Sequence, residues 1–596
     1  MKQNSPTKTS ALLLLALFLF TPKSLSQTPM LDFAKVLETN HDQGVWSRAT
    51  VTDTEGNFYM TGLFHGTVDF DPDAGSFPLV YQGGTLNDTD GESDVFIAKY
   101  NPNGELIWAK RLIEPTFTGM NEERGSSIII DDNNNLFLSG FTNTRGFFVS
   151  KWSNDGNEIW TRYFDDAEAN GVTTFAIRKK DSSVLISGIF AGTVDFDPSV
   201  QINELTAFNN DGFLLSLSEN GNFEWVKQFR CNGGVIMTGL EVDSANNIFL
   251  SGVFLGTVDL NPDPNVNAFI TSQSVSTGAI SSAFIAKYNS NGELLWNRHL
   301  RGTASTDFFM TFIKKDSNDN IIVTGSFKGI ASFLSTPTTL NTGNFYASFL
   351  AKYDTTGSLL WANLFGTPTA TQTTFFPSSF CANVILDSCN NIYVSGEFQG
   401  NCDFNPAAGE NIESALTNLI GAFAAAYSPD GNYLWSMNIG GPGNVTFVEF
   451  NGYLPIALDN NNDLIFTGTF RQQLDFDPST SIKTLTSSSS NPNIAGVFMA
   501  KYDNPINNCQ LGVNGFEKSR SFSVYPNPSN GFVTIAVKEI AIGSALNVYD
   551  ISGKKLLSAK VDSESTTLDL GNFADGVYII EINDGSKTFH QKLILK

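Results

Sequence analysis

Pairs of oxygen-bearing side chains recur along the chain, in the order aspartate, apolar residue, aspartate or asparagine, proline. The order occurs five times, at Asp69–Pro72, Asp195–Pro198, Asp259–Pro262, Asp403–Pro406 and Asp475–Pro478. Residues i and i+2 of an extended chain share one face, so each copy places two oxygen-bearing side chains together. Because Ca²⁺ binds through several oxygen ligands, a calcium site is one interpretation of the repeat.

In the first copy a third acid follows at the same spacing, which makes Asp69, Asp71 and Asp73 the candidate calcium ligands. The structural interpretation is that aspartate or asparagine caps a turn that proline then fixes, with no ion. Proline also stands where calcium loops of the EF-hand type carry glycine. We therefore favour the capped turn and expect no cofactor, with calcium as the alternative.

No other spacing of reactive residues suggests catalysis. The four histidines, His41, His65, His299 and His590, are scattered along the sequence. The chain has no GxSxG elbow, glycine-rich phosphate loop or zinc pattern. Its five cysteines lack a CxxC spacing, which favours thiols and a single bridge at most over a metal site. The sequence therefore predicts a protein that is not an enzyme.

The elements that must position these residues belong to a repeated unit. A complete copy contains an apolar strand, an Asp/Asn turn, a strand ending in Ser-Gly or Thr-Gly, a variable stretch, a strand of the type Phe-Ile-Ala-Lys-Tyr, a second turn and a strand with tryptophan. The glycine of the second strand recurs at Gly62, Gly140, Gly188, Gly252, Gly325, Gly396 and Gly468. A four-stranded sheet with two apolar faces needs a partner on each face, and stacking such sheets around an axis supplies both.

The two ends of the repeat array predict a closed ring. The seventh copy stops at Tyr502 without its tryptophan strand, and the segment Phe33–Leu37 resembles Trp108–Leu112 of the first copy. An N-terminal strand that completes the last sheet would remove an open edge. The predicted fold is therefore all-β: a seven-bladed β-propeller over residues 31–503, closed by an N-terminal strand.

These repeats resemble the SBBP repeats of many secreted bacterial β-propellers and, more loosely, NHL repeats. The likeness covers roughly residues 31–503. It implies an architecture and generic binding, and does not by itself imply one activity.

A different pattern follows a predicted linker at 504–520. Strands separated by Gly, Pro and Asn turns predict a small Ig-like β-sandwich over residues 521–596. This block carries the elements YPNP-x-x-G, YD-x-x-G-K and G-x-Y. They are formed by Tyr525, Pro526, Asn527, Pro528, Gly531, Tyr549, Asp550, Gly553, Lys554, Gly576 and Tyr578.

In this order, the three elements resemble the type A sorting domain of the type IX secretion system of the Bacteroidetes. The resemblance implies that the type IX secretion machinery is a partner. It also implies transit through the periplasm and delivery as a secreted or outer-membrane surface protein. An ordinary Ig-like terminal module is the alternative.

The N-terminal residues have the parts of a secretory signal, with Lys2 and Lys8 before the apolar run Ala11–Phe20 and small residues up to Ser26. We predict a signal peptide at 1–26. The apolar run is shorter than the roughly 20 residues that cross a bilayer, so we expect no transmembrane segment in the mature protein. A formal net charge of −24 would repel phosphate backbones, which excludes nucleic acid as an expected partner.

Together these features predict an exported, non-catalytic binding or scaffold protein that holds an extracellular glycan or protein. Two alternatives remain open. One is a polysaccharide-active lyase or hydrolase whose acids converge from several repeats. The other is a structural adhesin or spacer with no small ligand.

Overall fold

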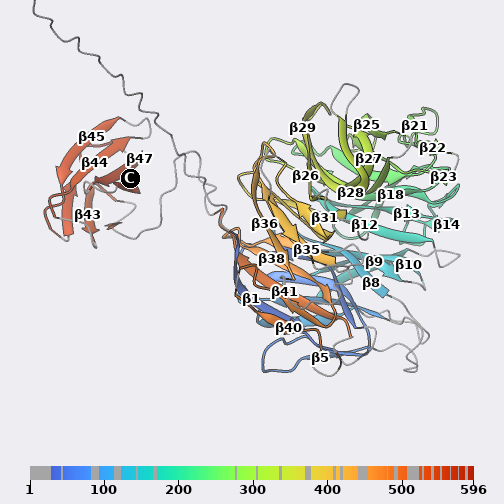
Figure 1. Ribbon diagram of the computed structural model, residues 1–596, viewed down its shortest axis with the longest axis horizontal. Helices are drawn as coiled ribbons and strands as arrows, with labels where there is room; N and C mark the ends of the chain where they lie inside the picture. The colour runs from blue at the N-terminus through green and yellow to red at the C-terminus, as the bar shows by residue number, and fades with distance from the viewer. Residues whose placement is uncertain are drawn as a thin grey trace, which may run out of the picture. The chain divides into compact units, whose positions relative to one another are not determined.

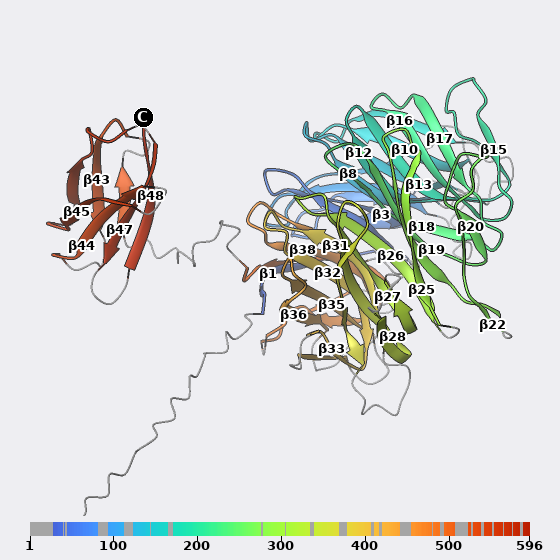
Figure 2. The same ribbon diagram turned by 90° about the horizontal axis from the view of Figure 1, so that it is seen from above.

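The computed structural model divides the chain into two compact units, residues 1–507 and 508–596 (Figures 1 and 2). It describes residues 28–596 except for segments 40, 42–43, 82–92, 113–122, 143–144, 165–170, 276–277, 304–305, 334–338, 369–377, 407–410, 416–419, 441–453, 480, 489–490, 492–493, 507–521, 526–528, 538–541, 551–553, 564, 575 and 584–587. The predicted signal peptide and most of the predicted linker lie outside the described residues. What is described is all-β, as the sequence predicts, and includes no helix long and apolar enough to cross a membrane.

The described part of the first unit contains five antiparallel sheets of four strands each. The first three sheets are β2 (Val45–Thr52), β3 (Phe58–Phe64), β6 (Asp94–Tyr100) and β7 (Leu106–Arg111); β8 (Glu123–Ile130), β9 (Leu136–Thr142), β10 (Gly146–Trp152) and β11 (Glu158–Phe164); and β12 (Val172–Lys180), β13 (Ser183–Phe190), β16 (Asp211–Ser218) and β17 (Phe223–Phe229). Another is β31 (Ser378–Leu386), β32 (Ile392–Gln399), β35 (Ile420–Tyr427) and β36 (Tyr433–Ile439). The last combines β37 (Ile456–Leu458), β38 (Leu464–Phe470) and β41 (Gly496–Asp503) with the N-terminal strand β1 (Met30–Leu37).

A further sheet has eight strands and consists of two four-stranded meanders. The first meander is β18 (Val235–Val242), β19 (Ile248–Phe254), β24 (Ser282–Tyr288) and β25 (Leu294–Gly302), and the second is β26 (Asp307–Lys315), β27 (Ile321–Ser332), β28 (Thr339–Tyr353) and β29 (Leu359–Phe365). The two meanders share one sheet because Arg301 and Gly302 of β25 pair with Ser332 and Ala331 of β27. Each meander has the strand order that the repeat predicts.

Short hairpins follow the second strand of five meanders and contain the Asp-x-Asp/Asn-Pro segments. They pair β4 (Thr67–Asp69) with β5 (Pro78–Val80), β14 (Thr193–Asp195) with β15 (Glu204–Thr206), β20 (Thr257–Asp259) with β21 (Phe269–Thr271), β33 (Asn401–Asp403) with β34 (Ile412–Ser414), and β39 (Gln473–Asp475) with β40 (Thr484–Thr486). Two-residue strands complete the unit: β22 (Ser274–Val275), β23 (Gly278–Ala279) and β30 (Thr367–Pro368).

The apolar run of the third strand is buried on both faces, as its continuous apolar sequence predicts, and in β28 this run is Ala347–Tyr353. All seven residues of β6 are buried. Tyr59 and Ile97 of the first sheet share one core cluster with Phe148 of the second, and comparable clusters lie along the rest of the unit. The sheets therefore bury their apolar faces against one another.

The N-terminal strand pairs with the last meander, which confirms the predicted partnership of the segment 33–37. β1 runs antiparallel to β41, with Leu37 opposite Val497 and Phe33 opposite Lys501. Leu37 is fully buried in this position. Residues more than 450 positions apart in the sequence thus form one sheet.

The first strands of the meanders contact one another in the order β2, β8, β12, β18, β26, β31, β37, and β2 also contacts β37 and β38. Hydrogen bonds join the first and last of these sheets. Thr467 Oγ1 lies 3.2 Å from Ser47 Oγ and 2.8 Å from Thr50 Oγ1.

The second unit contains two sheets that share one core. One holds β42 (Phe522–Tyr525), β43 (Phe532–Val537) and β46 (Ser565–Asp569), and the other holds β44 (Ala545–Asp550), β45 (Lys555–Lys560), β47 (Gly576–Asn583) and β48 (Thr588–Leu595). Val533 and Ile535 from the first sheet and Val548 and Ile580 from the second are fully buried in that core. This is the packing of a small β-sandwich.

Candidate functional site

The Asp-x-Asp/Asn-Pro segments form capped turns. Asp69 Oδ1 accepts backbone N–H bonds from Asp71 at 3.1 Å and from Phe77 at 2.8 Å. The first aspartate of each other copy accepts the corresponding pair of amides: Asp195 from Asp197 and Asn203, Asp259 from Asn261 and Ala268, Asp403 from Asn405 and Asn411, and Asp475 from Asp477 and Lys483. One carboxylate oxygen thus holds both ends of the hairpin loop.

The same segments are connected to the tyrosine of the third strand. The Tyr100 hydroxyl donates to the backbone oxygen of Phe70 at 3.0 Å, and both rings are fully buried. The contact recurs between Tyr288 and Leu260, Tyr427 and Phe404, and Tyr502 and Phe476. In the fifth meander, which lacks the segment, Tyr353 donates to the backbone oxygen of Phe333. Burial raises the pKa of Tyr100 well above its ordinary value, so the hydroxyl stays protonated as a donor.

The three candidate calcium ligands lie along one loop, where each takes a partner from the protein. Asp71 Oδ1 accepts the backbone N–H of Asp73 at 3.0 Å, and Asp73 Oδ2 forms an ion pair with Lys35 at 2.9 Å. Among the described residues no group of three or more His, Cys, Asp or Glu side chains is arranged to hold a metal ion. The geometry therefore favours the capped turn over the calcium site.

We expect that replacing Asp69 by alanine lowers the free energy of unfolding by about 1–3 kcal/mol, because two backbone amides lose their acceptor. Asp69→Asn retains an acceptor oxygen and should cost much less. Added millimolar Ca²⁺ should leave the melting temperature unchanged, as followed by thermal denaturation. A melting temperature that rises with Ca²⁺ and returns with EDTA, or an asparagine variant as unstable as the alanine variant, would restore the calcium site.

The turn between the first two strands holds a buried ion pair. Asp243 Oδ1 accepts the backbone N–H groups of Ala245 and Asn247, and its Oδ2 lies 2.9 Å from Lys287 Nζ of the third strand. Equivalent pairs are Lys352 with Asp316, Lys501 with Asp459 and Lys99 with Asp53. Burial opposes the charge on Asp243, but hydrogen bonds from Asn247 and Lys287 outweigh it and hold its pKa below the ordinary value.

The tryptophan of the fourth strand packs on the turn of the next sheet. Trp108 Nε1 donates to the backbone oxygen of Asn154 at 3.0 Å, and its ring covers Gly156 so closely that a Cβ there would lie 2.8 Å from the indole. Gly156 also has a positive φ of 75°, so both the space and the backbone exclude other residues. Phe33 of β1 covers Gly104 in the same way, with a Cβ there 2.7 Å from the ring.

Three cysteines, Cys231, Cys381 and Cys402, are free and buried, and Cys389 is disulfide-bonded. The structure also brings together His41 and His65, which share no sequence motif. Their rings stack with centroids 5.7 Å apart. A second cluster that the sequence does not reveal surrounds Glu241 on β18. Glu241 is held between Arg178 of β12 at 2.9 Å and Lys314 of β26 at 2.8 Å.

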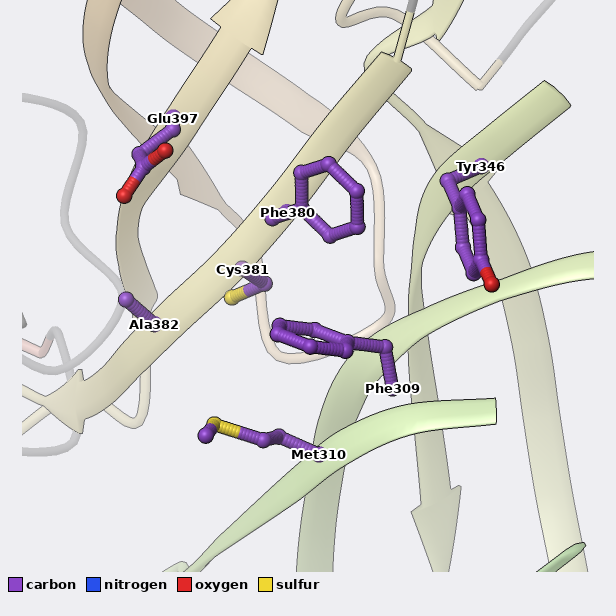
Figure 3. Close-up of a pocket in the computed structure, with 7 residues that line it drawn as sticks. All are labelled: Phe309, Met310, Tyr346, Phe380, Cys381, Ala382 and Glu397. Carbon is purple, nitrogen blue, oxygen red and sulfur yellow. The ribbon is translucent and has the colours of Figure 1, made fainter. Parts of the chain in front are cut away.

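A pocket of about 340 Å³ opens between the fifth and sixth meanders. It is lined by Phe309, Met310, Tyr346, Phe380, Cys381, Ala382 and Glu397, which we call the aromatic pocket (Figure 3). The rings of Phe309 and Phe380 meet edge to face with centroids 5.1 Å apart, and Tyr346 lies 5.2 Å from Phe380. Figure 3 places Tyr346 on one side of Phe380 and the Glu397 carboxylate on the other.

Two β-bulges form the wall of the aromatic pocket. Met310 is the extra residue between Phe309 and Thr311 of β26, and Ala382 is the extra residue between Cys381 and Asn383 of β31. Met310 has a positive φ of 51°, which a bulky side chain seldom adopts. The first strands β2, β8, β12 and β18 have register shifts at a comparable place, so the bulge belongs to the repeat, and the positive φ of Met310 distinguishes the one at this pocket.

Two ionisable groups of the aromatic pocket, Cys381 and Tyr346, are held in their protonated forms. Burial raises the pKa of the Cys381 thiol to about 12, so it stays protonated. Burial and the neighbouring Asp307 raise the pKa of Tyr346, whose hydroxyl donates to Asp307 Oδ2 at 2.5 Å. No repeated motif marks this pocket in the sequence, because its walls come from two meanders and from residues outside the repeat signature.

In the second unit, several residues of the sorting elements have structural contacts. Asp550 Oδ1 accepts the backbone N–H of Lys554 at 3.0 Å, and the Tyr578 hydroxyl donates to the backbone oxygen of Ala574 at 2.6 Å. Gly531 has a positive φ of 112°, and a Cβ there would lie 2.8 Å from Gly571.

Of the other sorting residues, three are described by the structure and four are not. Tyr525 is half-exposed in β42, the Tyr549 hydroxyl donates to Glu581 at 3.0 Å, and Gly576 begins β47. Pro526, Asn527, Pro528 and Gly553 lie outside the described residues.

Comparison with known proteins gives one family match, since residues 523–596 fit the secretion system C-terminal sorting domain. An uncharacterised WD repeat-containing protein of Acanthamoeba polyphaga mimivirus is 26% identical over 547 residues, which cover 76% of this chain and 37% of that protein. An endo-acting ulvan lyase of Formosa agariphila is 32% identical over 75 residues, 12% of this chain and 14% of the lyase. The chain thus spans well under half the length of either relative.

Solved structures give weaker likenesses. A protein of unknown function from Dyadobacter fermentans is 8% identical with a TM-score of 0.31, and the match covers 79% of this chain and 98% of that one. PorZ, a surface component of the type IX secretion system of Porphyromonas gingivalis, is 10% identical with a TM-score of 0.14, over 94% of this chain and 100% of PorZ. TM-scores this low carry no argument about the present chain.

The family match covers all the residues of the three sorting elements. Residues 523–596 are therefore a sorting domain of the type IX secretion system, and the chain that carries it is exported to the cell exterior or the outer-membrane surface.

Proposed function

We propose that the protein is an exported, non-catalytic binding protein whose first unit is a seven-bladed β-propeller of SBBP type, closed by the N-terminal strand. The observation that carries the ring is the equivalence of Phe33 and the repeated tryptophan. Trp108 of one sheet covers the turn glycine of the next sheet, and Phe33 of the last sheet covers Gly104 of the first. The contact of β2 with β37 and β38 supports the same arrangement.

The binding role is supported by what the repeated polar residues do. The recurrent aspartates cap turns or neutralise lysines, and the recurrent tyrosines hold backbone oxygens. The charged cluster around Glu241 is also fully engaged. Burial opposes the charge on Glu241, but Lys314 and Arg178 outweigh it and lower its pKa, which makes the carboxylate a weak base. These residues build the scaffold and leave ligand recognition to the variable positions.

Export should depend on the second unit. Deleting residues 521–596 in a bacterium that has the type IX machinery should leave the protein in the periplasm, measured by cell fractionation and by protection from protease added outside. A matched control within the same unit is Ile542→Ser at a site that is 65% exposed, which should be exported normally. Normal surface delivery of the deletion variant would contradict the dependence.

Binding without turnover is tested with the purified full-length mature chain. Incubated with extracellular polymers of its own cells, it should retain one class of polymer, and the retained polymer should be recovered with unchanged length. Shortened chains or newly formed unsaturated ends would instead show a hydrolase or a lyase. Failure to retain any polymer or surface protein would favour a spacer.

A further inference from the structure

We propose that the aromatic pocket binds an uncharged sugar ring of an extracellular glycan, an assignment that rests on the proposed binding function. The pocket lies between two neighbouring meanders and is bordered by three aromatic rings, one thioether and one carboxylate. Its volume of about 340 Å³ is in the range of small-molecule sites in proteins. Phe309 is 43% exposed, so its ring is accessible to a ligand.

The lining matches the two surfaces of a pyranose. One face of such a ring presents C–H groups, which gain dispersion contacts with aromatic carbon, while its rim presents hydroxyls. Phe309, Phe380 and Met310 supply the apolar contact. Glu397 stands at the edge, where a carboxylate accepts hydroxyl hydrogen bonds.

The backbone of Met310 is a second and independent sign that this wall serves a ligand. Six of the other seven described non-glycine residues with positive φ are asparagine or aspartate, which tolerate that conformation, and the seventh is Gln472. A glycine would take the same φ without strain. Strain of this kind concentrates at sites that need a particular side chain in place, and here the side chain is a pocket wall.

Charge selects the kind of sugar. None of the described lining residues is cationic, Glu397 is a carboxylate, Asp307 accepts a hydrogen bond from the Tyr346 hydroxyl, and the whole chain carries a net charge of −24. Uronates and sulfated sugars would therefore be repelled. An ammonium group is attracted to aromatic faces and to carboxylates, so a cationic ligand is the competing class that the test must separate. We assign the uncharged ring because apolar and aromatic side chains dominate the lining and match the C–H face of a pyranose.

The test uses the full-length mature protein and an array of neutral, uronate-containing and sulfated oligosaccharides, followed by calorimetry with the best neutral binder and with a lysine-rich peptide. We expect binding to neutral oligosaccharides, weakened about five- to tenfold by Phe309→Ala. The control is Phe208→Ala, which removes a ring that is 77% exposed and lies outside the pocket, and should bind as the wild type does.

Met310→Gly separates binding from folding. It removes the pocket wall and relieves the strained backbone, so the melting temperature should stay the same or rise while affinity falls. Preference for the peptide or for acidic sugars would overturn the ligand class. If Phe309→Ala and Met310→Gly leave neutral-sugar binding unchanged, the sugar does not bind in the aromatic pocket, but the proposed binding function still stands. The binding function fails only if the wild type retains no polymer or surface protein.

Discussion

Removing β1 from the mature chain should lower the free energy of unfolding by more than about 5 kcal/mol, since several buried apolar side chains of about 1.5–3 kcal/mol each lose their contacts. Leu37 is fully buried in the core cluster shared with the first sheet, and Ala34 and Val36 pack in the cluster shared with the sixth meander. β41 would also lose its backbone partner on the edge that β1 covers and would remain paired only with β38. Chemical denaturation of the full-length mature chain with and without residues 28–37 measures the difference.

Point variants locate the effect within β1. Phe33→Ala removes the ring that covers Gly104 and should cost about 2 kcal/mol, a reduced value because the side chain is only partly buried. Met30→Ala, at the start of the same strand, removes a side chain that is 68% exposed and should change little. If the deletion left the denaturation midpoint unchanged, β1 would not be part of the folded ring and the proposed closure would fail. Exposure of the β41 edge should also make the deletion variant prone to aggregation.

Much of this architecture is visible in the sequence because it depends on local patterns. The runs at Val95–Tyr100 and Phe33–Leu37 have the composition of buried and edge strands, and their pairing partners follow from the repeat order. The capped turn at Asp69 follows from the intrinsic preference of aspartate before proline. Such features can be predicted from short stretches of chain, provided that equivalent segments of the repeat adopt the same structure.

What the sequence does not reveal arises between repeats. The glycine at position 156 is expected from its turn, but its second reason, the Trp108 ring of the preceding sheet, depends on packing. The aromatic pocket needs two bulges, at Met310 and Ala382, and a bulge has no reliable sequence signature. The nearness of His41 and His65 likewise depends on two loops that meet only in the fold.

Lys287→Met is expected to lower the free energy of unfolding by about 3–5 kcal/mol, because it leaves the Asp243 carboxylate buried without its cation. The two side chains are 8% and 4% exposed, and their charged atoms lie 2.9 Å apart. Lys179→Met provides the control, since Lys179 and Glu219 form a pair whose side chains are 21% and 38% exposed and should contribute under about 1 kcal/mol. Urea denaturation of both variants at neutral pH gives the comparison.

A second substitution decides whether the loss comes from the unpaired charge. Asp243→Asn combined with Lys287→Met retains an oxygen that caps the turn and removes both charges, so most of the stability should return. The sixth meander retains the aspartate without the lysine, because Ala426 replaces the lysine and the Tyr393 hydroxyl donates to Asp387 at 2.9 Å. Phe249 occupies the position of that tyrosine beside Asp243, so Lys287→Met has no such donor. No recovery in the double variant would mean that the lysine stem packs the core and that charge is secondary.

The pH dependence gives the sign of the electrostatic contribution. The pKa of Asp243 is lower in the folded protein than in the unfolded chain, so its contribution is present above about pH 4 and is lost as the pH falls through the folded value. Below that pH the carboxyl is neutral whether or not Lys287 is present, so the deficit of Lys287→Met relative to the wild type should shrink on acidification. A deficit that stays constant from neutral pH to pH 2 would show that the pair contributes through packing alone.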